Sequence, residues 1–492
     1  MKGQPGRLAV DRAGPFAGSA IDRDRPLQFR LNGRVLNGFA GDTVLSAVLA
    51  AGIDSLGRRG DADVALSTRC APAIIATALA ADQQRALAMD RTLVTDGAEY
   101  LTLGPRRRRG VRERVRGLTG PASTLDADLT QPAPLPWLNT VGAVETPADL
   151  IVVGGGVAGM SAAVAAEQAG LSVILLEQSP RLGGYARLFG TLEGEESADA
   201  SLLRLGTAVV GAAGITVLTH AAAFAARPGA VRVHLTDKAG TMPSARVLDL
   251  HARHIVLATG SSERLPLFDG NRLPGTVGVR EAYDLAQYYG VWPGASALFA
   301  TSSSVAYRLA MLARDAGIAV PRIIDSRGRP QSRFIEFSKA YGITLAAGTV
   351  IAAAQRDSQG SGLVVAPRLA MEDFIREEPA LTVDRLVAYG GWQPDLDLWH
   401  MAGGSSVWDA QAGRLEAGDG PQGMALAGNA AGYRGLHACL MSGQAAVDRL
   451  LDRPQQGVTE FSVDPIYETP DAPTPAAKPS AGRGAACFLG PG

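Results

Sequence analysis

The stretch that decides the fold is DLIVVGGGVAGMSAAVAAEQAGLSVILLE, residues 149–177. Its apolar beginning predicts a short buried strand over residues 150–153, and the glycines that follow match the spacing G-x-G-x-x-G. Residues 162–169 predict a helix, and residues 172–176 predict a second strand that ends in Glu177. A strand, a glycine turn, a helix and a strand that ends in an acid are together typical of a unit that binds a dinucleotide.

Each glycine of this turn has a separate expected task. Gly154 permits the tight turn, Gly156 lets the backbone approach a pyrophosphate, and Gly159 lets the helix pack close to the strand. The N-terminus of the helix would offer N–H groups and a partial positive charge to the phosphates, and Val157 and Ala158 in the turn are further candidate contacts. The turn therefore predicts a dinucleotide site, and the alternative is a unit of the same fold with an empty site.

The end of the second strand carries the expected ribose contact. Glu177 can accept hydrogen bonds from an adenosine ribose, and its charge repels a 2′-phosphate, so the pattern disfavours NADP. Gln178 follows it as a further candidate contact.

Three other segments add candidate contacts. PRLGGYAR (180–187) follows the second strand, HIVLATG (254–260) is a strand with a turn typical of proteins with two dinucleotide domains, and GMALAGNAAG (423–432) is a late apolar strand. The residues expected to lie at a bound dinucleotide in these segments are Gly183, Gly184, Thr259, Gly260, Gly428 and Asn429. FAD-binding proteins usually carry Asp at the position of Asn429, which weakens the case for FAD, so NAD is favoured and FAD stays open.

A second strand–helix–strand unit lies at residues 295–327, ASALFATSSSVAYRLAMLARDAGIAVPRIIDSR. Thr301–Ser304 stand where the glycines are expected, and their side chains would obstruct a pyrophosphate. This unit is expected to be structural, so the chain should bind one dinucleotide.

The N-terminal region predicts a small β-rich domain. Residues 27–53 begin with alternating apolar residues, Asn32-Gly33 suits a type I′ hairpin turn, and Asp42 or Thr43 can cap a short helix. A hairpin followed by such a helix opens the plant-type ferredoxin fold. Because the segment after the helix, LGRRGDADVALSTRC (56–70), contains only one cysteine, Cys70, the domain is expected to lack an iron–sulfur cluster.

Composition excludes several other classes of protein. The chain has 492 residues, 46% of them hydrophobic, so it should form several packed domains. Because its formal net charge is −1, we do not expect the basic surface that binds nucleic acid. The start of the chain has no apolar core of a secretory signal, and glycines interrupt the longest apolar run, so a cytoplasmic protein with no membrane span is expected. The spacing of the six histidines predicts no metal site.

These patterns predict an α/β protein of several parts. The expected parts are an N-terminal arm at 1–26, a ferredoxin-like domain at 27–104, a linker with a basic run at 105–148, a dinucleotide-binding domain at 149–290 and 391–452, a second, degenerate nucleotide-type domain at 291–390, and a flexible tail at 453–492.

Three segments resemble one known family, the alpha subunits of heterotetrameric sarcosine oxidases. They are residues 27–53, residues 258–294, and YGGWQPDLDLWHMAGGSSVWD at 389–409. The alpha-like subunits of opine oxidases, hydroxyproline dehydrogenases and hydrogen cyanide synthases share this plan, and the resemblance covers residues 20–452. It implies a two-dinucleotide-domain, flavoprotein-type fold with an N-terminal ferredoxin-like domain.

The resemblance also implies cofactors and partners. NAD would bind this half of the alpha subunit, a separate beta subunit would carry FAD and oxidise the amine, FMN would lie between the two subunits, and small gamma- and delta-type subunits could join them. A folate-handling half that follows in the family is expected to be absent, because the chain ends at CFLGPG.

No residue set in the sequence predicts a catalytic centre, because no nucleophile has a nearby base and no cysteines pair. The leading hypothesis is therefore a dinucleotide-binding subunit that works with a flavin subunit on a secondary amine or imino acid. The alternatives are a stand-alone FAD- or NAD-dependent reductase and a non-catalytic assembly subunit that nucleotide stabilises.

Overall fold

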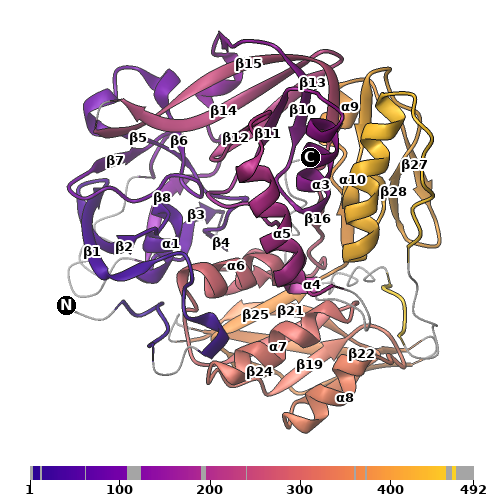
Figure 1. Ribbon diagram of the computed structural model, residues 1–492. Coiled ribbons are helices and arrows are strands. Elements are labelled where there is room, and N and C mark those ends of the chain that lie inside the picture. Colours follow the sequence, from indigo (N-terminus) through magenta and orange to yellow (C-terminus); the bar gives the residue numbers. More distant parts are fainter. Residues whose placement is uncertain are drawn as a thin grey trace.

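The computed structural model describes residues 4–10, 14–60, 62–107, 123–189, 196–239, 241–358, 362–371, 374–460 and 468–472. Figure 1 shows three parts around a common centre: a β-rich N-terminal part in indigo, a large α/β part in magenta and yellow, and a second α/β part in salmon and orange. The predicted basic run lies outside the described residues from residue 108 onward, as does Cys487.

The N-terminal part is built on a five-stranded sheet of order β2-β1-β7-β5-β6. Its strands are β1 (Asp22–Leu31), β2 (Arg34–Ala40), β5 (Ala73–Ala76), β6 (Leu87–Ala88) and β7 (Glu99–Thr102). The predicted hairpin turn is confirmed, because Asn32 and Gly33 have φ angles of 54° and 78°. Of the two candidate caps, Thr43 begins α1 (Val44–Ala50): its hydroxyl accepts a hydrogen bond from the N–H of Ser46 at 3.1 Å.

A three-stranded sheet of order β4-β3-β8 completes this part. Its strands are β3 (Ser55–Arg59), β4 (Ala62–Ala65) and β8 (Thr124–Asp128). The structure thus places a strand within residues 105–148, where the sequence analysis assigned only linker. β8 is five residues long with Leu125 as its one buried residue, and it gains its place by pairing with the distant strand β3, a contact that local sequence does not encode.

The first nucleotide-type domain has a sheet of order β12-β11-β10-β15-β14-β13, with β29 also paired to β15. Its strands are β10 (Ala148–Val153), β11 (Val173–Leu176), β12 (Ile215–Leu218), β13 (Ala221–Arg227), β14 (Ala230–Ala239), β15 (Met242–Leu257) and β29 (Met424–Leu426). The pairs β12–β11, β11–β10, β10–β15 and β15–β29 are parallel, as the glycine turn and its strands predicted. The helices of this domain are α3 (Val157–Gln168), α5 (Ala198–Gly211) and α10 (Leu436–Leu450), which share one apolar core with the sheet.

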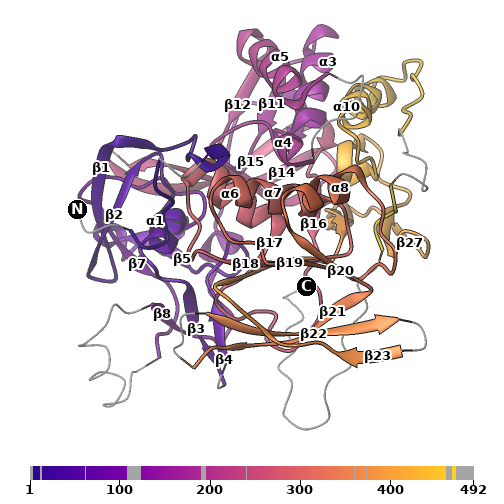
Figure 2. The same ribbon diagram turned by 90° about the horizontal axis from the view of Figure 1, so that it is seen from below.

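The second nucleotide-type domain has a parallel sheet of order β17-β25-β18-β19-β20. Its strands are β17 (Thr276–Gly278), β18 (Ala297–Thr301), β19 (Arg322–Asp325), β20 (Thr344–Ala347) and β25 (Arg385–Tyr389). The helices α6 (Val279–Tyr289), α7 (Val305–Asp315) and α8 (Arg333–Ala340) lie on one side, and an antiparallel sheet lies on the other (Figure 2). That sheet contains β21 (Thr349–Arg356), β22 (Leu363–Met371), β23 (Phe374–Glu377) and β24 (Leu381–Val383).

The structure places β17 and α6 in this second domain, whereas residues 276–289 were expected in the first domain. β17 is three residues long and gains its place by pairing with β25, more than a hundred residues later in the chain, a contact that local sequence does not encode. The chain crosses between the two domains through β16 (Ser261–Glu263) and β26 (Trp392–Pro394), which pair antiparallel.

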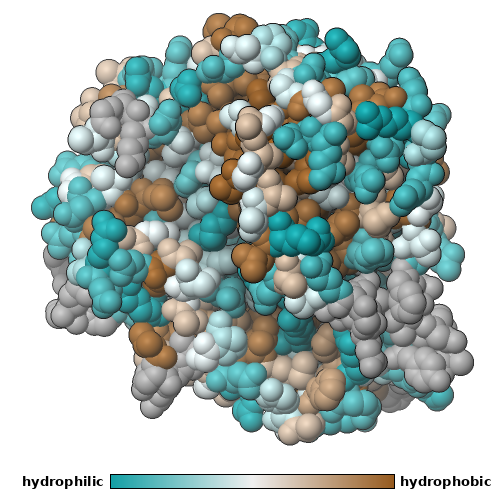
Figure 3. Space-filling model, viewed as in Figure 1, coloured by the Kyte–Doolittle hydropathy of each residue, from teal (hydrophilic) through white to brown (hydrophobic). Residues whose placement is uncertain are grey.

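The remaining elements are short. They are β9 (Ala143–Val144), α4 (Ala186–Phe189), α9 (Asp397–Met401), the hairpin of β27 (Ser406–Asp409) and β28 (Arg414–Ala417), and 3-10 turns at Gly14–Phe16, Thr77–Leu79, Gln83–Arg85, Pro136–Asn139 and Gly428–Ala431. On the face seen in Figure 3, apolar side chains form separate patches between hydrophilic ones. Over the residues that the structure describes, no helix is both long enough and apolar enough to cross a membrane.

Candidate dinucleotide site

A cavity of about 670 Å³ lies where the three parts of the molecule meet. The first nucleotide-type domain contributes the glycine turn, the loop after β11 and the ends of β15 and β29, while the second contributes α6. The N-terminal part contributes Thr43, Leu45, Ala65, residues 67–70, Asp90 and Arg91. Cavities of this size, bounded by a glycine turn at the carboxyl ends of parallel strands, are where α/β proteins bind nucleotides.

The three glycines of the turn have different surroundings. A Cβ on Gly154 would lie 2.2 Å from the carbonyl oxygen of Ala258, and a Cβ on Gly159 would lie 1.8 Å from that of Gly154. Gly154 also has a φ of 109°, which disfavours a side chain. A Cβ on Gly156, in contrast, would meet no described heavy atom within 4 Å and would project into the cavity. The turn is therefore closely packed on its protein side and leaves room for a ligand at Gly156.

Glu177 ties the glycine turn to the end of β11. Its buried carboxylate accepts hydrogen bonds from the N–H of Gly155 at 2.8 Å and from the N–H of Ser179 at 2.7 Å, one on each oxygen. Burial raises the pKa of this carboxyl group, and the backbone donors oppose that rise. Since a carboxylate oxygen can accept two hydrogen bonds, each oxygen retains capacity for a ribose hydroxyl.

The loop after β11 lies against the glycine turn. The N–H of Gly183 donates to the carbonyl of Gly155 at 2.9 Å, and both Gly183 and Gly184 have positive φ angles, of 124° and 55°. Gly184 lies so close to Gly156 that a Cβ on it would stand 3.3 Å from the Gly156 Cα. The two segments predicted to approach the cofactor are thus adjacent, and Gln178 also lines the cavity.

The predicted contact residues that follow β15 and β29 line the cavity and also make hydrogen bonds that support its walls. Thr259 donates to the carbonyl of Asp395 at 2.9 Å, which holds the turn after β15 to the segment before α9. Gly428 donates to the hydroxyl of Ser442 at 2.7 Å, and the side-chain amide of Asn429 donates to the carbonyl of Tyr433 at 2.8 Å. Gly260 lines the cavity beside Thr259.

The structure therefore brings twelve of the thirteen predicted contact residues to one cavity wall. They are Gly154, Gly156, Val157, Ala158, Glu177, Gln178, Gly183, Gly184, Thr259, Gly260, Gly428 and Asn429. Gly159 lies behind the turn, where it packs against the carbonyl of Gly154, so its task is structural.

Sequence reasoning missed the opposite wall, which α6 and β16 form. Glu263 accepts hydrogen bonds from the N–H groups of Val279 at 2.7 Å and Arg280 at 3.1 Å, at the start of α6. Burial raises the pKa of Glu263 to about 7. Arg280 donates to the hydroxyl of Ser261 at 2.6 Å and its guanidinium lies 4.8 Å from the ring centroid of Tyr185.

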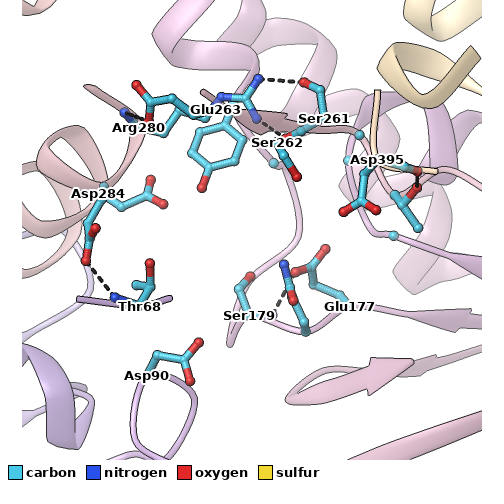
Figure 4. Close-up of a pocket in the computed structure, with 18 of the residues that line it drawn as sticks. Thr68, Asp90, Glu177, Ser179, Ser261, Ser262, Glu263, Arg280, Asp284 and Asp395 are labelled. Atoms are coloured by element: carbon cyan, nitrogen blue, oxygen red, sulfur yellow. Dashed lines mark hydrogen bonds between the residues drawn. The ribbon is translucent and has the colours of Figure 1, made fainter. Parts of the chain in front are cut away.

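Asp284 of α6 faces the cavity (Figure 4), and Glu281 of the same helix also lines it. Glu281 accepts a hydrogen bond from the N–H of Thr68 at 2.7 Å, which joins the N-terminal part to α6. Burial raises the pKa of Asp284 to about 7, and a hydrogen bond from Tyr185 opposes that rise. No local pattern indicates these residues, because they reach the site only through the packing of three separate parts.

The described residues hold no redox cysteine pair and no metal site. Cys70 and Cys439 are both free, and burial raises the pKa of the Cys439 thiol to about 12, so it stays protonated. No group of three or more His, Cys, Asp or Glu side chains that could hold a metal ion occurs in the described part of the chain. Both cysteines line the cavity, whose other polar side chains can bind and orient a polar ligand.

The fold and this cavity are typical of an α/β protein that binds a dinucleotide. The chain belongs to the pyridine nucleotide-disulphide oxidoreductase family, whose model matches residues 148–409, a little more than half of the chain. Family membership implies that FAD or NAD binds. A model of the 2Fe-2S iron-sulfur cluster binding domain matches residues 24–99, which confirms the ferredoxin-like fold, and this stretch contains one cysteine, Cys70.

Curated relatives agree with the resemblance in the sequence. The chain is 28% identical over 490 residues to the alpha subunit of sarcosine oxidase from Rhizobium meliloti (strain 1021), which covers 88% of this chain and 46% of the relative. It is 27% identical over 467 residues to the alpha subunit of sarcosine oxidase from Corynebacterium sp. (strain U-96), with 90% and 45% covered. It is 27% identical over 334 residues to one of the subunits of opine oxidase from Agrobacterium tumefaciens (strain Ach5), with 61% and 64% covered.

The chain spans about half the length of the sarcosine oxidase subunits that it matches. Among solved structures, L-proline dehydrogenase from P. horikoshii has a TM-score of 0.59 and 18% identity, with 88% of this chain and 75% of that chain covered. That similarity confirms the predicted fold class, an α/β dinucleotide-binding fold of flavoprotein type.

Proposed function

We propose that this chain is the dinucleotide-binding, alpha-type subunit of a multi-subunit oxidoreductase that oxidises a secondary amine or imino acid. The amine-oxidising flavin would reside on a partner beta-type subunit, FMN would lie at the interface with that subunit, and NAD would fill the cavity of this chain. The names of the relatives, which are subunits of sarcosine and opine oxidases, support this assignment.

One observation carries the proposal. Among the residues that the structure describes, a single glycine turn leaves room for a pyrophosphate, because a Cβ on Gly156 would project into the cavity. We call such an open turn a glycine cradle. The corresponding turn of the second domain, Thr301–Ser304, is buried. An enzyme that passes electrons from a pyridine nucleotide to a flavin within one chain needs two such cradles. One cradle without a cysteine pair is what a subunit that works with a partner flavin requires.

The cavity residues suit a dinucleotide. The glycine turn and the start of α3 would hold the pyrophosphate through backbone N–H groups, and Glu177 would hold the adenosine ribose. Bound NAD supplies a ring that accepts a hydride. On the far wall, Arg280 and Glu263 fix the start of α6, and Asp284 with Tyr185 offers polar groups to the second half of the ligand.

A comparison of the chain alone with the co-expressed complex tests the function. With a dye as electron acceptor, the pure chain should oxidise neither sarcosine, proline nor opines, and oxidation of at least one of them should appear when a beta-type flavin subunit is co-expressed and co-purified. Robust amine oxidation by the chain alone would contradict the proposal and favour the stand-alone reductase. A colourless, inactive chain that retains no partner and no nucleotide would favour the assembly subunit.

A further inference from the structure

The second nucleotide-type domain has the strand, turn and helix of a glycine cradle, but its turn is buried and hydrogen-bonded within the protein. All four residues of Thr301–Ser304 are buried, with exposed fractions of 0 to 4%. The N–H of Ser302 donates to the carbonyl of Tyr389 at 3.2 Å, and the N–H of Ser303 donates to the hydroxyl of Thr301 at 2.9 Å. Backbone donors that would face a pyrophosphate in a working cradle are therefore engaged within the protein.

The acid that ends β19 is engaged as well. Asp325 is fully buried and accepts a hydrogen bond from the hydroxyl of Tyr307 at 2.8 Å. Its other partner is Arg327, whose guanidinium lies 2.7 Å away in an ion pair with a side-chain exposure of 3%. A ribose hydroxyl would have to compete with both partners for this carboxylate.

A segment from the end of the chain occupies the space beside these groups. Residues 468–472 run over the second cradle, and their backbone makes most of the contacts. The N–H of Ala472 donates to the carbonyl of Ser302 at 3.1 Å, and the buried Arg327 donates to the carbonyl of Thr469 at 2.9 Å. The N–H of Thr469 donates to the carbonyl of Gln331 at 2.8 Å.

Side chains of the segment add further contacts, among them those of Thr469 and Asp471. The Thr469 hydroxyl accepts a hydrogen bond from the N–H of Gln331 at 2.8 Å, so the two residues bind each other reciprocally. Asp471 forms an ion pair with Arg434 at 2.8 Å, and Arg434 also donates to the hydroxyl of Ser303 at 3.2 Å. Because Arg434 precedes α10 in the first domain, the segment bridges the two nucleotide-type domains.

We propose that the second nucleotide-type domain is a peptide-binding site and that its ligand is the chain's own segment 468–472. Buried arginine, backbone carbonyls and backbone N–H groups recognise an extended peptide in the place where a nucleotide would otherwise lie. The segment thereby fixes the two domains to each other next to the cofactor cavity, which Arg434 also lines. This inference is independent of the cofactor and of the reaction of the complete enzyme.

Hydrogen–deuterium exchange of the full chain tests the proposal. In the wild type, the amides of Thr469, Ala472 and Gln331 should exchange slowly. A variant that carries Thr469→Ala and Asp471→Asn loses one hydrogen bond and one ion pair, and these amides should exchange at least ~10-fold faster. Thr469→Ser keeps the hydroxyl and should behave like the wild type, as should Asp24→Asn on an exposed part of β1.

Two results would overturn the proposal. One is rapid exchange of Thr469 and Ala472 in the wild type, at the rate of an unstructured peptide. The other is the binding of a second NADH per chain by the double variant, measured by calorimetry. That result would mean that the segment only covers a nucleotide site that is able to bind its ligand. A circular-dichroism spectrum that matches the wild type confirms that the double variant is folded.

Discussion

At the scale of single residues, Gly156 is the position where a substitution should change dinucleotide binding without changing the fold. A Cβ there meets no described atom, whereas a Cβ on Gly159 would clash with the carbonyl of Gly154. We expect Gly156→Val to fold and to lose dinucleotide binding, because its branched side chain fills the space for the pyrophosphate. The midpoint of thermal unfolding should stay within a few degrees of that of the wild type. The affinity for NAD, measured by calorimetry, should fall at least ~100-fold.

The matched control is Gly206→Val on α5, where a Cβ also meets open space and which lies outside the cavity. It should bind NAD like the wild type. Undiminished binding by Gly156→Val would show that the glycine turn is not the site.

Glu177 should determine which nucleotide binds. Its charge repels the 2′-phosphate of NADP, so the wild type should prefer NAD. Glu177→Gln removes the charge, and the preference should narrow by about 10-fold, since one unit of charge at this distance contributes about 1–2 kcal/mol. The amide also directs an N–H₂ group at the N–H of Gly155 or Ser179, so the turn should lose about 1–3 kcal/mol of stability. Equal affinity of the wild type for NAD and NADP would refute the assignment.

At the scale of elements, α6 supplies the wall of the cavity that titrates near neutral pH. The pKa of Asp284 is raised to about 7 in the folded chain, above its usual value of 3.8. The folded state then binds the proton more tightly than the unfolded state, so this residue's contribution to stability is complete below about pH 4 and is lost as the pH rises through about 7.

Asp284→Asn removes this dependence on pH. Between pH 5 and pH 8 the variant should gain about 1–3 kcal/mol of stability relative to the wild type, because each pKa unit corresponds to about 1.4 kcal/mol. Thermal midpoints measured across this range check the slope, with Asp199→Asn on the exposed side of α5 as control. Parallel curves for wild type and Asp284→Asn would contradict the pKa assigned to this group.

Local sequence predicts the elements whose signals are local. The glycine turn, the Asn32-Gly33 hairpin and the cap at Thr43 each lie within a few residues, and the structure confirms all three. β8 and β17 were not predicted, because each is short and is stabilised by a partner far away in the chain. For the same reason the predicted contacts cover the glycine-turn wall of the site, while the α6 wall required the fold.

The end of the chain also makes contacts that local sequence does not predict. Its Pro- and Ala-rich composition predicted a flexible tail, but residues 468–472 bind the second domain through backbone atoms, which composition does not reveal. Residues 473–492, with most of that tail, lie outside the described residues.

At the scale of the whole molecule, three parts meet at one cavity, and each part contributes a wall. The hydrogen bond from Thr68 to Glu281 and the contact of His220 with the carbonyl of Arg91 at 2.8 Å hold the N-terminal part against the other two. The ferredoxin-like domain therefore forms one wall of the candidate dinucleotide site. In the same arrangement the second nucleotide-type domain supplies α6 to the site and keeps its own cradle closed.

The number and identity of the nucleotides bound per chain distinguish a subunit with one NAD site from a flavoprotein that works alone. Purified chain, alone and with a co-expressed beta-type subunit, is denatured, and the released nucleotides are separated and quantified by mass spectrometry against the protein concentration. We expect one NAD per copy of this chain, with flavin found only in the sample that contains the partner. Two nucleotides per chain, or stoichiometric flavin released from the chain alone, would contradict it.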